Sequence, residues 1–327
     1  MALAGRGVCR RAVSGGGFRM RALIQPAAWV IHALVPLRPR PGDCCMMAQS
    51  PNPREIPAMN LVTYLGKQVL GVLASYRNGD IAVDICGVYP QWDNRLRVFF
   101  PRGHSLQVGE LATLHLDNRS GVDEFDSAIR VYRASYKGRV LSVEDDWALL
   151  EPRECVLMHG FAPVVEITES GYAFPPDARP EHPVPVSPLV NLPRIEGRDR
   201  DNKVGVLITQ AQEQPHTTVL AFLSSEDDDI FLITFPETFK SRLLKRNPHC
   251  FFVMDERATF TFERAIQWNY TIIEGDAHQI ANGSALFESV RQAFIDKNPW
   301  ELPFFLREDL EMYHIRCQRV VCPGIRD

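Results

Sequence analysis

Two threonines and a lysine stand close together where a phosphate group could bind. Thr234 ends an apolar run, and Thr238 and Lys240 follow at the expected start of a short helix. Hydroxyl donors and one ammonium group at a helix start favour a doubly charged anion, because the helix N-terminus is itself positive. The alternative is that Thr238 merely precedes the helix and that Lys240 is a solvated surface charge, like the basic residues at 242, 245 and 246.

A strand, a helix and a second strand must position these residues. The run Ile-Phe-Leu-Ile at 230–233 predicts the first strand, and the run at 250–254 predicts the second. Between them, Pro236 suits the first turn of a helix and Glu237 complements the positive end of its dipole. Asn247 and the proline after it end that helix.

The surrounding region reads as an antiparallel barrel with helices at its openings. Short apolar and β-branched runs separated by turn residues predict strands, and apolar spacing on one face predicts the later helix. The expected strands are Val204–Thr209, Thr217–Leu223, Ile230–Phe235, Cys250–Met254, Ala265–Gln279 and Met312–Val321, and the helix is Ala285–Asp296.

The order of these features resembles the pyridoxamine 5′-phosphate oxidase-like split barrels. In that family a strand ends in Thr, a Ser or Thr and a Lys follow two residues apart, and Asn-Pro precedes the next strand; residues 234–248 match this order. The run at 272–277 is similar to the family's strand with a Gly-x-Ala ending. The resemblance covers residues 200–323 and implies flavin mononucleotide (FMN) bound between the two subunits of a homodimer.

The chain departs from the family at two positions. The oxidases of the family carry an arginine before the lysine, where this chain has Phe239, and another on the preceding strand, where an ungapped count reaches Thr218. His216 stands nearby and supplies a partial charge in this interpretation. The cofactor-binding residues expected from the resemblance are therefore Thr234, Thr238, Lys240, Thr218 and His216.

The resemblance implies a flavin-dependent oxidoreductase acting on an unknown small-molecule redox substrate. No acid or base can be named from the sequence, and the groups that would bind a vitamin B6 phosphate are not identifiable, which disfavours vitamin synthesis. The alternative is a non-catalytic ligand sensor or interaction protein. In that reading the N-terminal β module binds a cyclic dinucleotide or a partner.

That N-terminal module, residues 59–165, consists of short runs with a strand-like pattern, at the spacing expected of a small barrel. The segment Asn118-Arg-Ser-Gly weakly resembles the loop of PilZ domains, which are small barrels that bind a cyclic dinucleotide. The later glycine of the PilZ pattern is replaced by Asp123, and no upstream Arg-x-x-x-Arg is present in this module. A plain turn explains the same composition. Arg119, Arg130 and Arg133 then form a solvated face.

The chain divides into four parts. Residues 1–58 read as a disordered or wrongly assigned leader, or else as a targeting segment. Residues 166–199 are a proline-rich linker between the β module and the split-barrel domain, since dense prolines keep the backbone extended. The expected fold class is mainly β: a small N-terminal barrel, then an FMN-binding split barrel with short helices.

Composition excludes several classes of protein. Residues 1–42 hold seven arginines and no acid, which leaves 29 of the 36 basic residues against all 40 acidic ones and a formal charge of −11 for the remainder. Such an acidic body disfavours nucleic acid as a partner. The apolar run at 22–37 is short for a membrane span, so we expect no membrane partner. Cysteine spacing gives no metal signature and suits a cytoplasmic protein.

Overall fold

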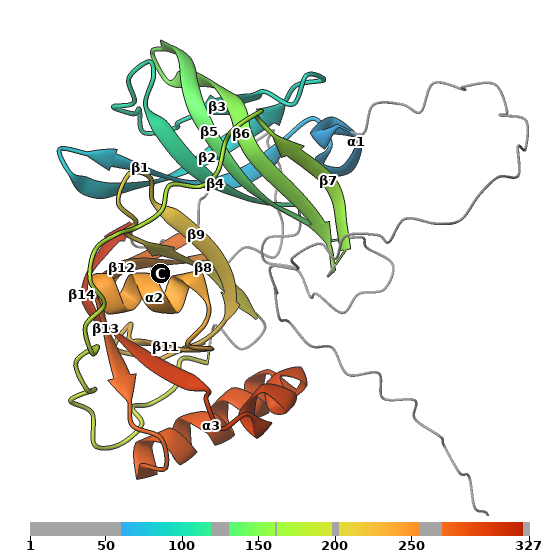
Figure 1. The fold of residues 1–327 in the computed structure, drawn as a ribbon. Coiled ribbons are helices and arrows are strands. Elements are labelled where there is room, and N and C mark those ends of the chain that lie inside the picture. The colour runs from blue at the N-terminus through green and yellow to red at the C-terminus, as the bar shows by residue number, and fades with distance from the viewer. Residues whose placement is uncertain (1–59, 119–130, 161, 198–202, 256–269, 323–327) are drawn as a thin grey trace, which may run out of the picture.

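The computed structural model describes residues 60–118, 131–160, 162–197, 203–255 and 270–322. They form two β modules joined by a long connecting segment, and Figure 1 shows the first, blue to green, stacked on the second, yellow to red. The first module contains α1 (Leu61–Leu65), β1 (Val69–Arg77), β2 (Asp80–Pro90), β3 (Leu96–Phe99), β4 (Leu111–Asp117), β5 (Tyr132–Glu144), β6 (Trp147–His159) and β7 (Ala162–Thr168). The second contains β8 (Val204–Thr209), β9 (His216–Ala221), β10 (Leu223–Ser224), β11 (Ile230–Thr234), α2 (Phe239–Arg246), β12 (His249–Asp255), β13 (Tyr270–Ile280), α3 (Ala285–Lys297), a 3₁₀ helix (Pro299–Leu306) and β14 (Glu311–Cys322).

In the described part of the chain, the first module is a closed antiparallel barrel. Its strands follow the order β3-β2-β1-β4-β5-β6, and β6 pairs back with β3 to close it. β7 extends the free edge of β6. Asn78 and Gly79 join β1 to β2 with φ angles of 54° and 91°, which is the left-handed backbone that a tight two-residue hairpin needs.

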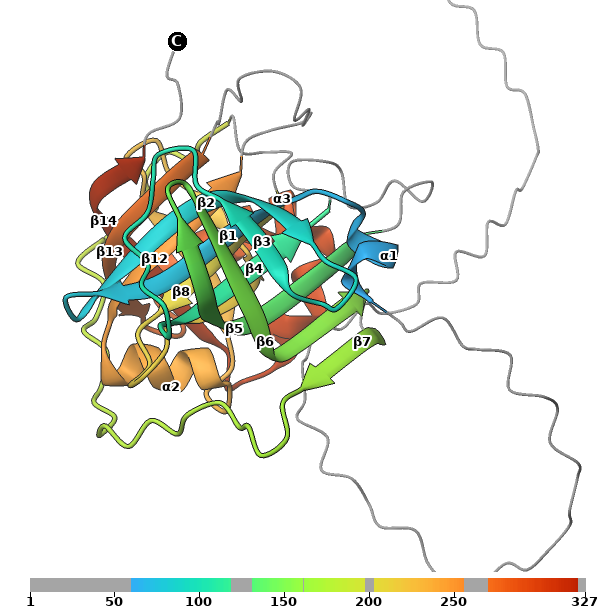
Figure 2. The same cartoon turned by 90° about the horizontal axis from the view of Figure 1, so that it is seen from above.

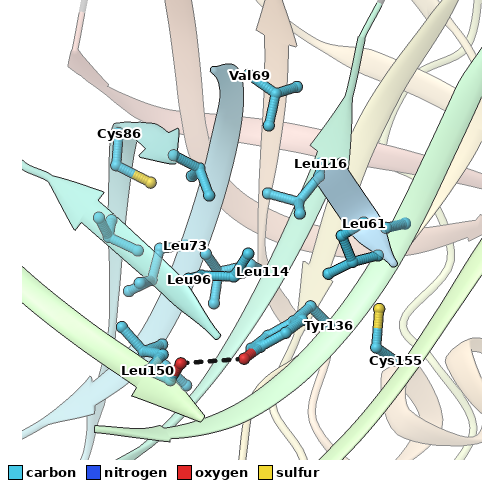
Figure 3. Packing of buried hydrophobic residues seen from close by; sticks show 14 of the residues in the cluster. Leu61, Val69, Leu73, Cys86, Leu96, Leu114, Leu116, Tyr136, Leu150 and Cys155 are labelled. Carbon is cyan, nitrogen blue, oxygen red and sulfur yellow. Dashed lines mark hydrogen bonds between the residues drawn. The ribbon is translucent and has the colours of Figure 1, made fainter. Parts of the chain in front are cut away.

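The barrel is filled by one hydrophobic cluster drawn from all of its strands (Figure 3). Leu73, Leu96 and Leu114 are fully buried there, together with Tyr136. The hydroxyl of Tyr136 donates to the carbonyl of Leu150 at 3.2 Å, so the one polar atom of this ring is satisfied inside the barrel. The barrel interior is therefore a packed core.

The second module is a curled half barrel. Its sheet has the order β10-β11-β14-β13-β12-β8-β9, with every neighbouring pair antiparallel. α2 connects β11 to β12, and α3 with the 3₁₀ helix connects β13 to β14. α3 buries Leu286, Val290 and Phe294 against the sheet side that carries Phe231 and Met312.

The two modules pack through an apolar seam. β1 is buried on both faces: Val69 and Leu73 enter the barrel core, whereas Leu70 and Val72 contact the half barrel. A strand covered on both faces reads as a nearly continuous apolar run, and residues 69–74 of β1 fit this pattern. The half barrel contributes Val206 and Ile208 of β8, Phe251 and Val253 of β12, and Ile272 of β13.

The connecting segment between β7 and β8 lies along the half barrel. Val184 is buried in the half-barrel core, and Val186 forms a parallel bridge with Gln279 of β13. Farther along, Ile195 bridges Ser225. In Figures 1 and 2 the segment passes α2, where the N–H of His182 donates to the Lys245 carbonyl at 2.9 Å.

The predicted fold class is confirmed: the chain is mainly β, with a closed barrel followed by a curled half-barrel sheet and short helices. One helix boundary was wrong, because α2 begins at Phe239 with Thr238 as its N-cap, so Pro236 and Glu237 lie in the loop before it. The described helices include none long and apolar enough to cross a bilayer. The leader at 1–58 and the PilZ-like residues 119–130 lie outside the described residues.

Candidate functional site

The loop between β11 and α2 is fixed by its own threonines. The Thr238 hydroxyl donates to the Phe235 carbonyl at 2.8 Å, so it accepts from the Thr234 hydroxyl at 3.0 Å and from the Ser241 N–H at 3.4 Å. The structure thus brings the two predicted threonines together. Because both hydroxyl protons are used inside the loop, the threonines shape the helix start and leave other groups to contact a ligand.

Lys240 occupies the second position of α2 and has no hydrogen bond or ion pair with any described residue. Burial disfavours its charged form and lowers the pKa of Lys240 from 10.5 to about 8, while Glu237 opposes the shift. The first turn of a helix also leaves backbone N–H groups without intrahelical partners. Lys240 and these N–H groups form one donor set at the start of α2.

His216 begins β9 and packs edge-on against two phenylalanines. Its ring centroid lies 5.0 Å from that of Phe239 and 5.7 Å from that of Phe174, and the two phenylalanine rings are 5.6 Å apart. Nδ1 of His216 is buried with no hydrogen-bond partner among the described residues. Burial, then the charges of Lys137 and Lys240, lower the pKa of His216 to about 3, so the ring is neutral at pH 7.

Thr218 lies two residues along β9 and so faces the same side as His216. The structure therefore gathers His216, Phe239 and Lys240 at one place, with Thr218 next along the strand. Phe239 stands where the resemblance expects an arginine, and it fills that position with an aromatic contact to His216 in place of a charge.

Sequence reasoning missed Lys137. It lies in β5 of the first module, is buried with 8% of its surface exposed, and forms an ion pair with Glu154 of β6. Its ammonium group also lies 4.8 Å from the centroid of the Phe174 ring. In the sequence, Lys137 is simply a charged residue in a strand of alternating polarity, and such a residue ordinarily faces water.

The remaining basic residues of α2 differ in their surroundings. Lys245 donates to a carboxylate oxygen of Glu311 at 2.7 Å, and Arg246 lies 2.9 Å from a carboxylate oxygen of Glu181. Arg242 is exposed, with its guanidinium 5.9 Å from the Phe239 centroid. The alternative of a solvated basic face therefore describes Arg242 but neither Lys245 nor Arg246.

A second polar cluster joins three distant parts of the second module. The Ser187 hydroxyl lies 2.9 Å from Nδ1 of the fully buried His314, and Nε2 of His314 lies 3.2 Å from a carboxylate oxygen of Asp229. Asp229 also accepts from the Cys317 N–H at 3.0 Å. This cluster fastens the connecting segment to β14, and it shows that the acidic turn before β11 is partly built into the core.

Other expectations concern cysteines, metals and the first module. The described residues contain no group of His, Cys, Asp and Glu able to hold a metal ion. Cys86, Cys155 and Cys250 are buried free thiols. Arg133, expected on a solvated face, pairs with Asp117 at 2.7 Å. The cyclic-dinucleotide hypothesis remains a prediction, because most of its loop lies outside the described residues.

No family model and no curated protein matches this sequence. Solved structures similar to part of the chain include the heme storage protein HutZ of Vibrio cholerae, with 18% identity over 37% of this chain and 86% of that one and a TM-score of 0.32. A FAD-binding protein of Mesorhizobium loti shares 17% identity over 36% of this chain and 83% of its own, with a TM-score of 0.30. A Listeria innocua protein assigned as a pyridoxamine 5′-phosphate oxidase shares 19% identity over 36% and 88%, with a TM-score of 0.25. Resemblances of this strength say nothing about what this chain binds.

Proposed function

We propose that this chain binds flavin mononucleotide and that the phosphate of the flavin lies at the start of α2. The observation that carries the proposal is Lys240, whose side chain is half-buried and whose ammonium group has no ion-pair partner among the described residues. A partly buried charge of this kind is unfavourable unless an anion lies beside it. A phosphomonoester carries close to two negative charges at neutral pH and matches that need.

The neighbouring donors suit the same group. Backbone N–H groups of the first turn of α2 point out of the helix start, and the helix dipole favours negative charge there. The buried, unpartnered Nδ1 of His216 supplies a further polar atom close by. Thr234 and Thr238 hold the loop in the conformation that presents these donors.

The proposed activity is that of a flavin-dependent oxidoreductase with an unknown small-molecule redox substrate. Bound flavin would supply hydride or electron transfer, and the protein would supply position and electrostatics. No side chain of the described residues is assigned to proton transfer. A homodimer is part of the expectation taken from the resemblance, and it is tested together with the stoichiometry below.

The test is a titration of the purified full chain with FMN, followed by quenching of flavin fluorescence, with riboflavin as the ligand that lacks the phosphate. We expect FMN to bind and riboflavin to bind at least 10-fold more weakly. Lys240→Met should weaken FMN binding about 10- to 100-fold, since a hydrogen bond to a charged group contributes about 1.5–3 kcal/mol. Lys245→Met, on the same helix but paired with Glu311, is the matched control and should change binding less than 3-fold.

Three results would contradict the proposal. A chain that takes up neither FMN nor riboflavin has no flavin site. A chain that binds both equally, with no effect of Lys240→Met, holds the flavin by its ring and has no phosphate site at α2. A heme absorption band in the purified protein would show that the chain binds heme and not flavin.

A further inference from the structure

A lysine of the barrel, Lys137, lies beside the aromatic cluster that includes His216 and Phe239. The residues of β5 alternate between the two faces of the barrel wall: Tyr136 enters the barrel core, and Lys137 points to the outside. Lys137 is buried only because the half barrel and the connecting segment cover that outer face. A lysine on an outer barrel face is ordinarily solvated, so the burial of Lys137 between the two modules is unusual.

Strand register places Lys137 beside His216. Lys137 is directly opposite Thr113 of β4, so the two side chains share the outer face. The Thr113 hydroxyl donates to the carbonyl of Pro215 at 2.6 Å, and Gln214 donates to the carbonyl of Ala112 at 2.9 Å. These two bonds dock the chain just before His216 onto β4, next to Lys137.

One aromatic ring links the two modules at this point. Phe174 of the connecting segment lies beneath the ammonium of Lys137, at 4.8 Å, and contacts both His216 and Phe239. Lys240 follows Phe239 in α2. Lys137, His216 and Lys240 are therefore grouped around one aromatic cluster, with residues drawn from the barrel, the connecting segment and the half barrel.

The charges of this group are not balanced within the seam. Lys137 is paired with Glu154, and the carboxylate near Lys240, among the residues that the structure describes, is the exposed Glu237. The hydroxyl of Tyr172, whose pKa burial raises to about 12, is neutral at pH 7. Lys137 therefore has an ion-pair partner in the half-buried Glu154, whereas Lys240 has no ion-pair partner among the described residues, which leaves room for a further negative charge beside Lys240.

We infer that Lys137 of the barrel completes the anion site at the start of α2, so that a single chain holds the phosphomonoester of the flavin between its two modules. This inference rests on the proposed function. It differs from the resemblance in which part of the protein forms the side of the site opposite α2. The resemblance implies a wall from a second subunit. Here the face of β8, β12 and β13 that a second copy could approach is already covered by β1 of the same chain.

The positions of the missing arginines agree with this arrangement. Phe239 and Thr218 stand at the positions where the resemblance stated above implies arginines. The cation of Lys137 reaches the same neighbourhood from the other module. The barrel therefore replaces charge that the half barrel lacks, and any homodimer meets through a surface other than this seam.

The experiment measures FMN and riboflavin affinity for the full chain carrying Lys137→Met, with Arg139→Met as control. Arg139 lies two residues along β5 on the same outer face but pairs with Glu151 and is partly exposed. We expect FMN binding to weaken at least 10-fold in Lys137→Met, riboflavin binding to stay within 2-fold, and Arg139→Met to match the wild type. Binding should saturate at one FMN per chain at concentrations where light scattering finds a monomer.

A second variant guards against loss of folding. Lys137→Met leaves the half-buried Glu154 without its partner, so the double variant Lys137→Met/Glu154→Gln removes the charge from both. It should fold, by circular dichroism, and still bind FMN at least 10-fold more weakly. If it folds and binds FMN as tightly as wild type while Lys240→Met does not, the inference is overturned and the proposed function stands. If binding needs a dimer, completion by the same chain is likewise overturned. If the wild type binds no FMN, both fail.

Discussion

Replacing Lys240 by methionine should stabilise the free protein while it weakens FMN binding. Burial lowers the pKa of Lys240 from 10.5 to about 8, so the folded state disfavours the charged form. At about 1.36 kcal/mol per pKa unit, the difference corresponds to about 3 kcal/mol. The side chain keeps partial exposure, which screens part of the effect, and we expect about 2 kcal/mol of added stability at pH 7.

The pH dependence of stability separates the effect of the Lys240 charge from the effect of the apolar contacts that methionine adds. Below pH 8, Lys240 is protonated in both the folded and the unfolded wild type. The full free-energy cost of burying its charge is therefore present. Between pH 8 and 10.5 the folded state releases the proton first, the unfolded state binds more protons, and wild-type stability rises. The advantage of Lys240→Met should therefore shrink by about 2 kcal/mol across this window.

Urea unfolding at pH 7 and at pH 10.5, with intrinsic tryptophan fluorescence as the signal, measures both quantities. Lys245→Met is the matched variant, and it should be destabilised at pH 7 because it leaves Glu311 without its lysine. A Lys240→Met protein that is less stable than wild type at pH 7 would contradict this prediction. So would a difference in stability between the two proteins that does not change with pH.

Three further substitutions test the local structure by urea unfolding at pH 7. Thr238→Ala removes the N-cap of α2 and should cost about 1 kcal/mol, whereas Thr238→Ser should cost much less. Gly205→Ala would place a methyl group against the Phe252 ring and 2.9 Å from the carbonyl of Val253, and should cost about 1–3 kcal/mol; a neutral result would mean that the packing of β8 on β12 is looser than described. Thr113→Val leaves the Pro215 carbonyl without its donor across the seam and should cost about 1–3 kcal/mol, with faster proteolysis of the connecting segment; unchanged stability and proteolysis would show that this bond does not hold the modules together.

The strands could be predicted because their patterns are local. The run at 204–209 matches β8, and the run at 230–235 contains β11. The helix before Asn247 was expected too early, because proline at position 236 is compatible with a first turn but equally with the loop before an N-cap. The threonine at the N-cap marks the actual start, since its side chain can accept from the backbone of the first turn.

The residues that the structure gathers near the start of α2 were predicted only in part. Thr234, Thr238 and Lys240 are close in sequence, so a local motif could group them. Lys137 lies about a hundred residues away and reaches this place through the register of β4 and β5 and through the packing of two modules. Such long-range pairing leaves no local pattern. Asp229, in the acidic turn before β11, likewise lies beside His314 through packing that the turn composition does not reveal.

The central claim is tested most directly by a crystal structure of the full chain with FMN. We expect density for the phosphate within hydrogen-bonding distance of Nζ of Lys240, with the barrel of the same chain on the opposite side of the site and Lys137 facing the phosphate. The proposal would be contradicted by a flavin whose phosphate lies in solvent or against another part of the chain. In that case the first turn of α2 would contact no ligand.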